Sequence, residues 1–500
     1  MGPLGSRLRH APILLVATLA KVLFAMGVTL GELGRPRDAI TVYDDVVRVF
    51  GRWPEVTLAE QVARVLVYKG FTLGQLGQFQ DAVAACDEVV RRFGDRSEAG
   101  LAEQVARALV SKGFSLEQLG QFQEATATYD EVVSRYADHP EAPLAECLAK
   151  AMFNKGNTLG QLGQSQDALA AYDEVARRYS DRPEAALAEL VAMALFNKAA
   201  TLAQLGHLQD AITVCDEVVR RFGDRPEPAT AEWVAKALAN KGIALGQLGH
   251  PQDAMVVFDQ VIRRFADRPE TAFAGPVAEA LYGKGFTLAH LGQSQDAIAT
   301  YDELVRRFAD HPDAPLAEQV ARALVGKAVT LGQLGQSQDE VQVYDEVVRR
   351  FGDRPGPALT EWVAKALVNK GVTLGQLAHP QDEIAAYDDV VRRFGDRTEP
   401  GLAIRVAQAL INKGDTLGQL GRSQDAVQVY DEVVRRFGDR SEPILAEPVA
   451  NALVSKGTAL IASGKPGEAR PPLQEVLKRS EGATDPALLE LMGLARKLLA

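Results

Sequence analysis

The sequence has few of the residues on which disulfide frameworks, metal sites and most active sites depend. Its 500 residues include three cysteines, seven histidines and three tryptophans, and only 6% are aromatic. Cys86, Cys147 and Cys215 form no C-x-x-C pair that could hold zinc, and three cysteines are too few for a disulfide framework. We therefore expect no cofactor, no metal and a reducing, cytoplasmic location.

Positive charge and long apolar runs are also lacking. The formal net charge is −11 at pH 7, so no large basic field is present to hold a phosphate backbone, and we expect no nucleic acid partner. The longest apolar run, Ala11 to Ala20, has ten residues and ends at Lys21. A bilayer requires about 20 residues, so we expect no transmembrane helix and no membrane partner.

Motifs for catalysis or nucleotide binding are absent too. The sequence has no G-x-x-x-x-G-K-[ST], H-E-x-x-H or G-x-S-x-G. His207, His250 and His379 recur at one position of a repeat, which separates them along the chain. Catalytic groups must converge within a few ångströms, so we expect a protein that is not an enzyme.

One unit, repeated eleven times, takes the place of these features. The stretch GFTLGQLGQFQDAVAACDEVVRRFGDR, residues 70–96, returns in near-copies with a period of 43 residues and no insertion. Such a strict period indicates one stack of like units and not a string of separate domains. The second glycine of each LGQLG-like motif, here called the marker residue, falls at Gly34, Gly77, Gly120, Gly163, Gly206, Gly249, Gly292, Gly335, Ala378, Gly421 and Gly464.

Each unit carries two apolar stripes at helical spacing. In the second copy the first stripe predicts a long helix and comprises Leu58, Val62, Leu66, Leu73 and Leu76. The second stripe predicts a shorter helix and comprises Val83, Cys86, Val89, Val90 and Phe93. The marker residue falls between them, where a glycine can adopt the left-handed conformation that ends a helix. We therefore predict paired antiparallel helices and no strands.

This unit resembles the tetratricopeptide repeat. The resemblance rests on the positions of Leu66, Gly70, Leu73, Gly77 and Ala82, and on an aromatic residue that is Tyr in most copies, as at Tyr129 and Tyr301. The period departs from the 34 residues of the family pattern, and a lysine precedes the Gly70-type glycine in ten of the eleven copies. The resemblance implies an all-α superhelix, or solenoid, of about eleven helix-turn-helix repeats.

The domain boundaries follow from the repeat. Residues 1–6 include GPLGS, which looks like the remnant of a protease-cleaved expression tag. Residues 7–482 hold the eleven repeats, and residues 483–500 are expected to form a C-terminal capping helix that begins with Asp485 as N-cap and Pro486 as first helical residue.

In the family, the first helix of each repeat lines the concave surface, so the resemblance implies a binding groove there. Asparagines recur on that surface two residues before the Gly70-type glycine, and one carboxamide can both donate to and accept from a peptide unit. The alternative is that asparagine is simply a common residue of this repeat. The five asparagines are Asn154, Asn197, Asn240, Asn369 and Asn412.

Basic and apolar residues fall on the same surface. The basic residues, six before the glycine, could attract acidic peptides, or they could only pair with a glutamate four residues earlier. The apolar residues, three before or one after the glycine, could anchor peptide side chains or pack between repeats. Members of the two sets include Lys150, Lys236, Arg322 and Lys365, and Phe153, Phe196, Tyr282 and Phe286.

Together these features predict a non-enzymatic scaffold that binds a protein or an extended peptide along a groove. Two alternatives stay open. The array could associate with itself as a structural element, or it could be the recognition arm of a larger multidomain protein. The high content of Ala, Gly and Arg is typical of a bacterial protein.

Overall fold

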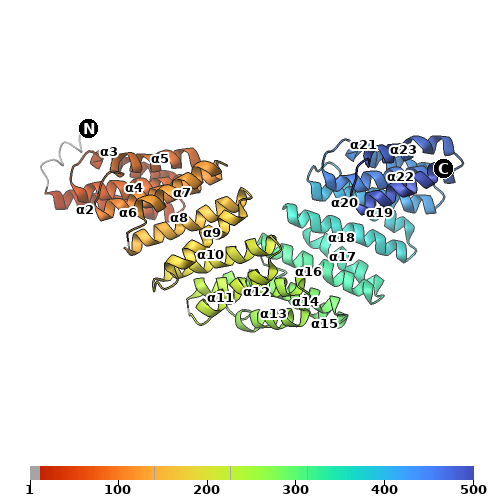
Figure 1. The fold of residues 1–500 in the computed structure, drawn as a ribbon, viewed down its shortest axis with the longest axis horizontal. Helices are drawn as coiled ribbons and strands as arrows, with labels where there is room; N and C mark the ends of the chain where they lie inside the picture. Colours follow the sequence, from red (N-terminus) through yellow and green to blue (C-terminus); the bar gives the residue numbers. More distant parts are fainter. Residues whose placement is uncertain (1–11, 140, 226, 312, 355) are drawn as a thin grey trace. The chain divides into compact units, whose positions relative to one another are not determined.

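The fold was analysed in a computed structural model, which describes residues 12–139, 141–225, 227–311, 313–354 and 356–500. Within these ranges the chain forms 23 α-helices and two short 3-10 helices, and no strand occurs there. Figure 1 shows the helices following one another as antiparallel pairs. The prediction of an all-α solenoid of helix-turn-helix repeats is confirmed. Residues 1–6, interpreted as a tag remnant, lie outside the described residues.

Each repeat contributes a first helix and a second helix. The first helices are α2 (Ile13–Glu32), α4 (Val56–Gln75), α6 (Ala99–Gln118), α8 (Ala142–Gln161), α10 (Ala185–Gln204), α12 (Pro228–Gln247), α14 (Ala274–His290), α16 (Ala314–Gln333), α18 (Pro357–Gln376), α20 (Pro400–Gln419) and α22 (Ala446–Ala462). The second helices are α3 (Pro36–Phe50), α5 (Phe79–Phe93), α7 (Phe122–Tyr136), α9 (Ser165–Tyr179), α11 (Leu208–Phe222), α13 (Pro251–Phe265), α15 (Ser294–Phe308), α17 (Ser337–Phe351), α19 (Pro380–Phe394), α21 (Ser423–Phe437) and α23 (Pro466–Arg479). Short 3-10 helices, η1 (Thr271–Phe273) and η2 (Pro443–Leu445), precede α14 and α22.

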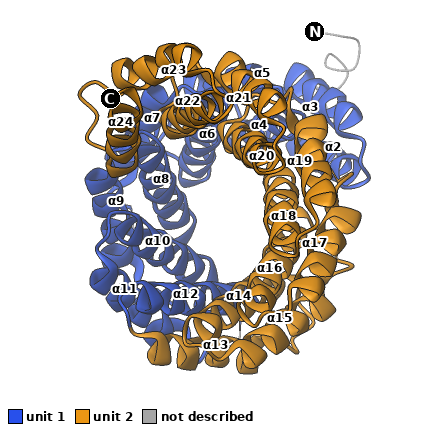
Figure 2. Ribbon diagram, turned by 90° about the vertical axis from the view of Figure 1, so that its right-hand side faces the viewer, with its two compact units in different colours: residues 1–249 blue, residues 250–500 orange. Residues whose placement is uncertain are grey.

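The chain divides into two compact units, residues 1–249 and residues 250–500, and each is described by itself. Within each unit a second helix packs against the first helices before and after it, and successive first helices also touch. Figure 2 shows that the first helices form the inner layer of each curved unit and the second helices the outer layer. Because each pair buries its apolar stripes against its neighbours, the core runs between the layers.

The turn between the two helices explains the marker residue. After α4, Gly77 has φ 73° and donates its N–H to the Gly74 carbonyl, while the Gln78 N–H reaches the Leu73 carbonyl. These two bonds form a Schellman cap, which requires a left-handed residue at this place. Glycine adopts that conformation at little cost because it has no Cβ.

Ala378 is the exception among the marker residues, and this gives a first prediction. It adopts φ 60°, and it is the only residue other than glycine with a positive φ in the described ranges. A left-handed alanine costs about 1 kcal/mol, so we expect Ala378→Gly to stabilise unit 2 by about that amount. Gly421→Ala is the matched change of opposite sign. Urea denaturation followed by circular dichroism tests both, and equal midpoints for Ala378→Gly and the parent would contradict the explanation.

Polar contacts cross every joint between successive repeats. The lysine before the Gly70-type glycine pairs with an aspartate 25 residues earlier, on the preceding second helix, as in Lys69–Asp44 at 2.6 Å and Lys284–Asp259 at 2.7 Å. Ten such pairs occur in the described residues, and the other eight lysines are Lys112, Lys155, Lys198, Lys241, Lys327, Lys370, Lys413 and Lys456. An arginine of the second helix also donates to the carbonyl that ends the preceding second helix, as in Arg436 to Gly395 at 2.9 Å.

The C-terminal end has its own helix, α24 (Pro486–Leu499), which packs against α22 and α23. Asp485 is its N-cap, and its carboxylate accepts hydrogen bonds from the Ala487 and Leu488 amides at 2.9 and 3.3 Å.

Three helices are long and apolar enough to cross a membrane by length and composition alone: residues 13–32, 185–204 and 443–462. The prediction of no such helix was wrong on this criterion, because it required an uninterrupted apolar run, and one lysine does not make a helix polar. The residues 185–204 and 443–462 are apolar because first helices pack on both sides inside the stack. Helix α2 differs, since only 22% of its most apolar window is buried.

Candidate peptide-binding face

The free side of the first helices carries exposed apolar residues. They stand one residue after the Gly70-type glycine, and between 40% and 57% of each is exposed. In unit 1 they are Phe71 and Phe114, and in unit 2 they are Phe286, Val329 and Val372. Exposed apolar residues that recur along one face are typical of a surface that binds other proteins.

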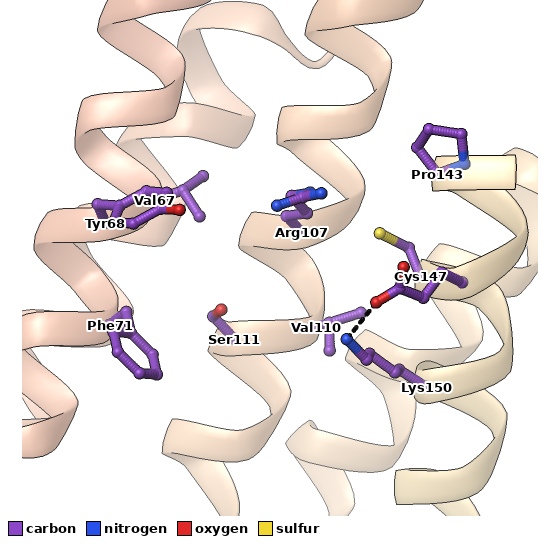
Figure 3. A pocket seen from close by; sticks show the side chains of 10 residues that line it. Val67, Tyr68, Phe71, Arg107, Val110, Ser111, Pro143, Cys147 and Lys150 are labelled. Atoms are coloured by element: carbon purple, nitrogen blue, oxygen red, sulfur yellow. Dashed lines mark hydrogen bonds and ion pairs between the residues drawn. The ribbon is translucent and has the colours of Figure 1, made fainter. Parts of the chain in front are cut away.

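In unit 1 this face has a hollow of 330 Å³ on α4, α6 and α8, lined by Val67, Phe71, Val110 and Cys147 among others (Figure 3). Its cations are already neutralised by carboxylates of their own helices. Arg107 pairs with Glu103 at 2.8 Å, and Lys150 pairs with Glu146 at 2.5 Å, the latter drawn as a dashed line in Figure 3.

Lys236, in the same unit, is neutralised in the same way. It pairs with Glu232 at 2.6 Å and lies 4.0 Å from the centre of the Trp233 ring. For Lys150 and Lys236 the structure therefore shows the helix-stabilising pair that was the alternative to a ligand contact.

Unit 2 has a groove of 410 Å³ on α14, α16 and α18, and it differs in its cations. Here the guanidinium of Arg322 lies 3.8 Å from the centre of the Tyr282 ring, and the Lys365 ammonium lies 4.8 Å from the Trp362 ring. Phe286 stacks on Tyr282 with ring centres 6.2 Å apart. Cations over aromatic rings remain available to an anion that enters the groove.

These cations also crowd one another. Burial, together with the charges of Arg405 and Arg322, lowers the pKa of Lys365 below its ordinary value. Burial lowers the pKa of Arg405 as well, and Glu361 opposes that shift. Among the residues that the structure describes, none of the three cations has a carboxylate within 4.0 Å. The groove therefore holds more positive charge than its own side chains pair.

One acidic residue lies near this groove. Burial raises the pKa of Glu279, on α14, and Arg322 opposes the shift. Glu279 replaces a basic residue of the repeat, so the positive charge is greatest toward α16, α18 and α20 and weaker toward α14.

The predicted asparagines lie at the joints between repeats. Asn369 Nδ2 donates to the Tyr344 hydroxyl at 3.3 Å, and Asn197 Nδ2 donates to Asn157 Oδ1, which also accepts from the Tyr172 hydroxyl. The other pairs across a joint are Asn154 with Tyr129 and Asn412 with Tyr387. Each asparagine thus faces the tyrosine 25 residues earlier, on the preceding second helix.

The same contact explains why the asparagines are interrupted. Where the facing residue is Phe258, which has no hydroxyl, the position is Gly283, and a Cβ there would lie 2.5 Å from the ring. Asn240 faces Cys215 and makes no hydrogen bond within unit 1. These contacts favour the interpretation that the asparagines belong to the repeat. A role in holding peptide backbone stays a prediction for all five.

The predicted aromatic residues divide in the same way. Phe153 is 7% exposed and packs on Tyr172, with ring centres 6.2 Å apart. Phe196 packs on Trp233 at 5.3 Å. Only Tyr282 and Phe286 line the groove of unit 2.

Glu117 was not singled out in the sequence, yet it joins two repeats. Its carboxylate accepts hydrogen bonds from the Tyr129 hydroxyl, at 2.9 Å, and from the Thr158 hydroxyl of the next first helix. Burial raises the pKa of Glu117 above 4.5, although both hydrogen bonds lower it in part. The other repeats have Gly or Ala at this position, and that difference was the available signal.

We expect Glu117→Gln to raise the stability of unit 1 at pH 7, because glutamine still accepts both hydrogen bonds without a buried charge. The folded state holds the Glu117 proton more tightly than the unfolded state does, so the parent gains stability as pH falls through the raised folded pKa toward 4.5. The advantage of Glu117→Gln should therefore shrink between pH 7 and 4.5. Urea midpoints at both pH values measure it, and an advantage that grows on acidification would contradict the assignment.

No group of three His, Cys, Asp or Glu side chains in the described ranges is arranged to hold a metal ion. The three cysteines are free and buried. Burial raises the pKa of Cys86 and Cys215 to about 12 and that of Cys147 to about 11, so the thiolate is disfavoured at all three.

Stacked antiparallel helix pairs of constant length define an α-helical repeat protein. The model of the tetratricopeptide repeat family matches residues 69–143, 153–226, 240–315 and 411–486, more than half of the chain. The chain therefore belongs to the tetratricopeptide repeat family.

Solved structures similar to this chain include three whose sequence identity is low. The apo form of RapI has a TM-score of 0.49 and 11% identity, over 75% of this chain and 97% of that one. The apo form of the quorum sensor NprR from B. thuringiensis has a TM-score of 0.43 and 12% identity, over 75% and 99%. A Rap protein complexed with Competence and Sporulation Factor has a TM-score of 0.36 and 14% identity, over 78% and 99%. A search of curated proteins finds no match.

Proposed function

We propose that this protein is a non-enzymatic scaffold whose first helices bind an extended segment of another protein. The observation that carries the proposal is the groove of unit 2, where Tyr282, Phe286 and Trp362 accompany the unpaired cations Arg322 and Lys365. Aromatic residues and arginine are the side chains that dominate binding energy at protein interfaces. Membership of the tetratricopeptide repeat family supports a role in protein interaction.

The ligand of this groove is proposed to be a segment that places a carboxylate beside an apolar side chain. The carboxylate would pair with Lys365 and Arg322, and the apolar group would lie on Phe286 and Tyr282. Glu279 disfavours further negative charge toward α14, so the acidic residues of the segment should be limited to the part nearer α18 and α20. The buried free cysteines support our proposal of a reducing, cytoplasmic location.

An array of peptides from the source proteome, probed with the full chain, tests this function. Arg322→Ala with Lys365→Ala is expected to weaken the bound peptides about ten-fold or more, since a close charge pair in a partly buried site contributes at least that much. The matched control is Arg107→Ala with Lys150→Ala, which removes two cations that already pair with their own helices. Equal losses in both double variants, or binding only to basic peptides, would contradict the proposal.

A further inference from the structure

The N-terminal end of the array lacks the polar residues that occupy its joints. At ten joints a lysine pairs with an aspartate of the preceding repeat, as in Lys69–Asp44. The corresponding residue of the first repeat is Met26, which is 50% exposed on α2 (Figure 1). A methionine has no use for the aspartate of a preceding repeat, and water would favour a polar residue at so exposed a position.

Two further positions change in the same direction. The residue that faces the preceding tyrosine, Asn or Ser in most repeats, is Ala25 in the first repeat. The arginine that donates to the preceding second helix, such as Arg436, is replaced by Val49. All three polar contacts of a joint are therefore apolar at this end.

The free face of α2 is also large-residue and apolar. Leu15 and Val22 are 60% and 57% exposed, whereas their counterparts in the second repeat, Leu58 and Val65, are fully buried against the first repeat. Leu33, at the C-cap of α2, is 69% exposed. This face thus has the position of a repeat joint, without a partner and without the polar groups that would match another repeat.

We propose that this face of α2, formed by Leu15, Val22, Met26 and Leu33, binds the same face of a second copy of the chain. The four residues are spaced by seven, four and seven, which is the spacing of a seam between two paired helices. Lys21 and Glu32 lie eleven residues apart on one edge of the seam. When two such helices pair antiparallel about a two-fold axis, like edges meet, so Lys21 of one copy approaches Glu32 of the other.

Two other partners fit this face less well. The C-terminal end of another copy offers Gln474 where every joint has an aspartate, and α24 packs against its last repeat. A lipid surface would favour a helix with a basic polar face, but the charged residues of α2 are Lys21 and Glu32, which cancel. Helix α2 is also held by α3 and α4 and buries Val16, Ala17 and Ala20.

Sedimentation equilibrium of the full chain across a range of concentrations tests the dimer. We expect the mass to rise from 53.9 kDa to twice that value, and Val22→Lys with Met26→Lys to hold it at 53.9 kDa with an unchanged helical circular dichroism spectrum. The control is Val256→Lys, a 63% exposed apolar residue of α13, which should dimerise like the parent. Oxidation of Met26→Cys gives a second readout, a disulfide-linked dimer, which needs no disruptive change.

Each remaining outcome would overturn the proposal. A parent that stays at 53.9 kDa at every concentration, or a dimer that survives Val22→Lys with Met26→Lys, would exclude pairing through α2. A mass that keeps rising with concentration would show open end-to-end assembly. If the parent stays monomeric and binds vesicles of phosphatidylcholine and phosphatidylglycerol, and the double variant does not, the face binds lipid and the dimer proposal fails.

Discussion

Tyr301→Ala is expected to destabilise unit 2 by about 3–5 kcal/mol, the usual cost of removing a large buried aromatic side chain. Tyr301, on α15, is 1% exposed and fills the space between two successive first helices. A Cβ at Gly285 of α14 would lie 2.6 Å from its ring, and one at Gly326 of α16 would lie 2.9 Å away. The alanine variant therefore leaves a cavity where three helices meet, and thermal or urea unfolding measures the loss.

Phenylalanine at the same position separates packing from hydrogen bonding. Among the described residues the Tyr301 hydroxyl has no hydrogen-bond partner, so we expect Tyr301→Phe to change stability by less than about 1 kcal/mol. Tyr129→Phe should cost more, because it removes the donor to Glu117 and leaves that buried carboxylate with one partner fewer. A loss for Tyr301→Phe as large as that for Tyr301→Ala would show that the cavity is not the cause.

Gly156→Val has the second-largest expected effect, a loss of about 1–3 kcal/mol from overpacking. On α8 a Cβ at Gly156 would lie 2.6 Å from the Tyr172 ring. Gly160, one turn further along the same helix, has no atom within 4 Å of such a Cβ. Gly160→Ala is therefore the matched control, and it should stabilise by about 0.5–1 kcal/mol because alanine favours helix over glycine.

Unfolding curves for the two α8 variants decide this prediction. Midpoints that shift in opposite directions support close approach of Tyr172 as the reason for glycine at position 156. Two variants that both stabilise the chain would contradict it, since helix propensity alone would then explain both results.

The candidate site could be predicted only in part. The sequence identified Arg322, Lys365, Tyr282 and Phe286 by their place in the repeat, and these residues do line one groove. It gave the same weight to Lys150 and Lys236, which the structure pairs with glutamates four residues earlier. Arg322 and Lys365 also have a glutamate four residues earlier, but they lie over Tyr282 and Trp362, so the choice depends on which ring stands within reach.

The asparagines show the same limit. Their position on the inner helices follows from the repeat, but their partner depends on the residue 25 positions earlier. Asn369 reaches the Tyr344 hydroxyl, whereas Gly283 stands where the facing residue is Phe258. A regular change of this kind could have been found by comparing the two positions copy by copy.

The sequence by itself determined the local architecture of this protein. The 43-residue period, the two apolar stripes and the marker glycine specify a helix pair, because helical periodicity and left-handed backbone depend on residues close together in the chain. Only the tertiary structure decided the roles of the polar residues. Lys69 and Asp44, or Arg436 and Gly395, are 25 and 41 residues apart and meet only after the repeats stack. The partner across each joint therefore decides whether a charge is neutralised, as at Lys69, or left available, as at Lys365.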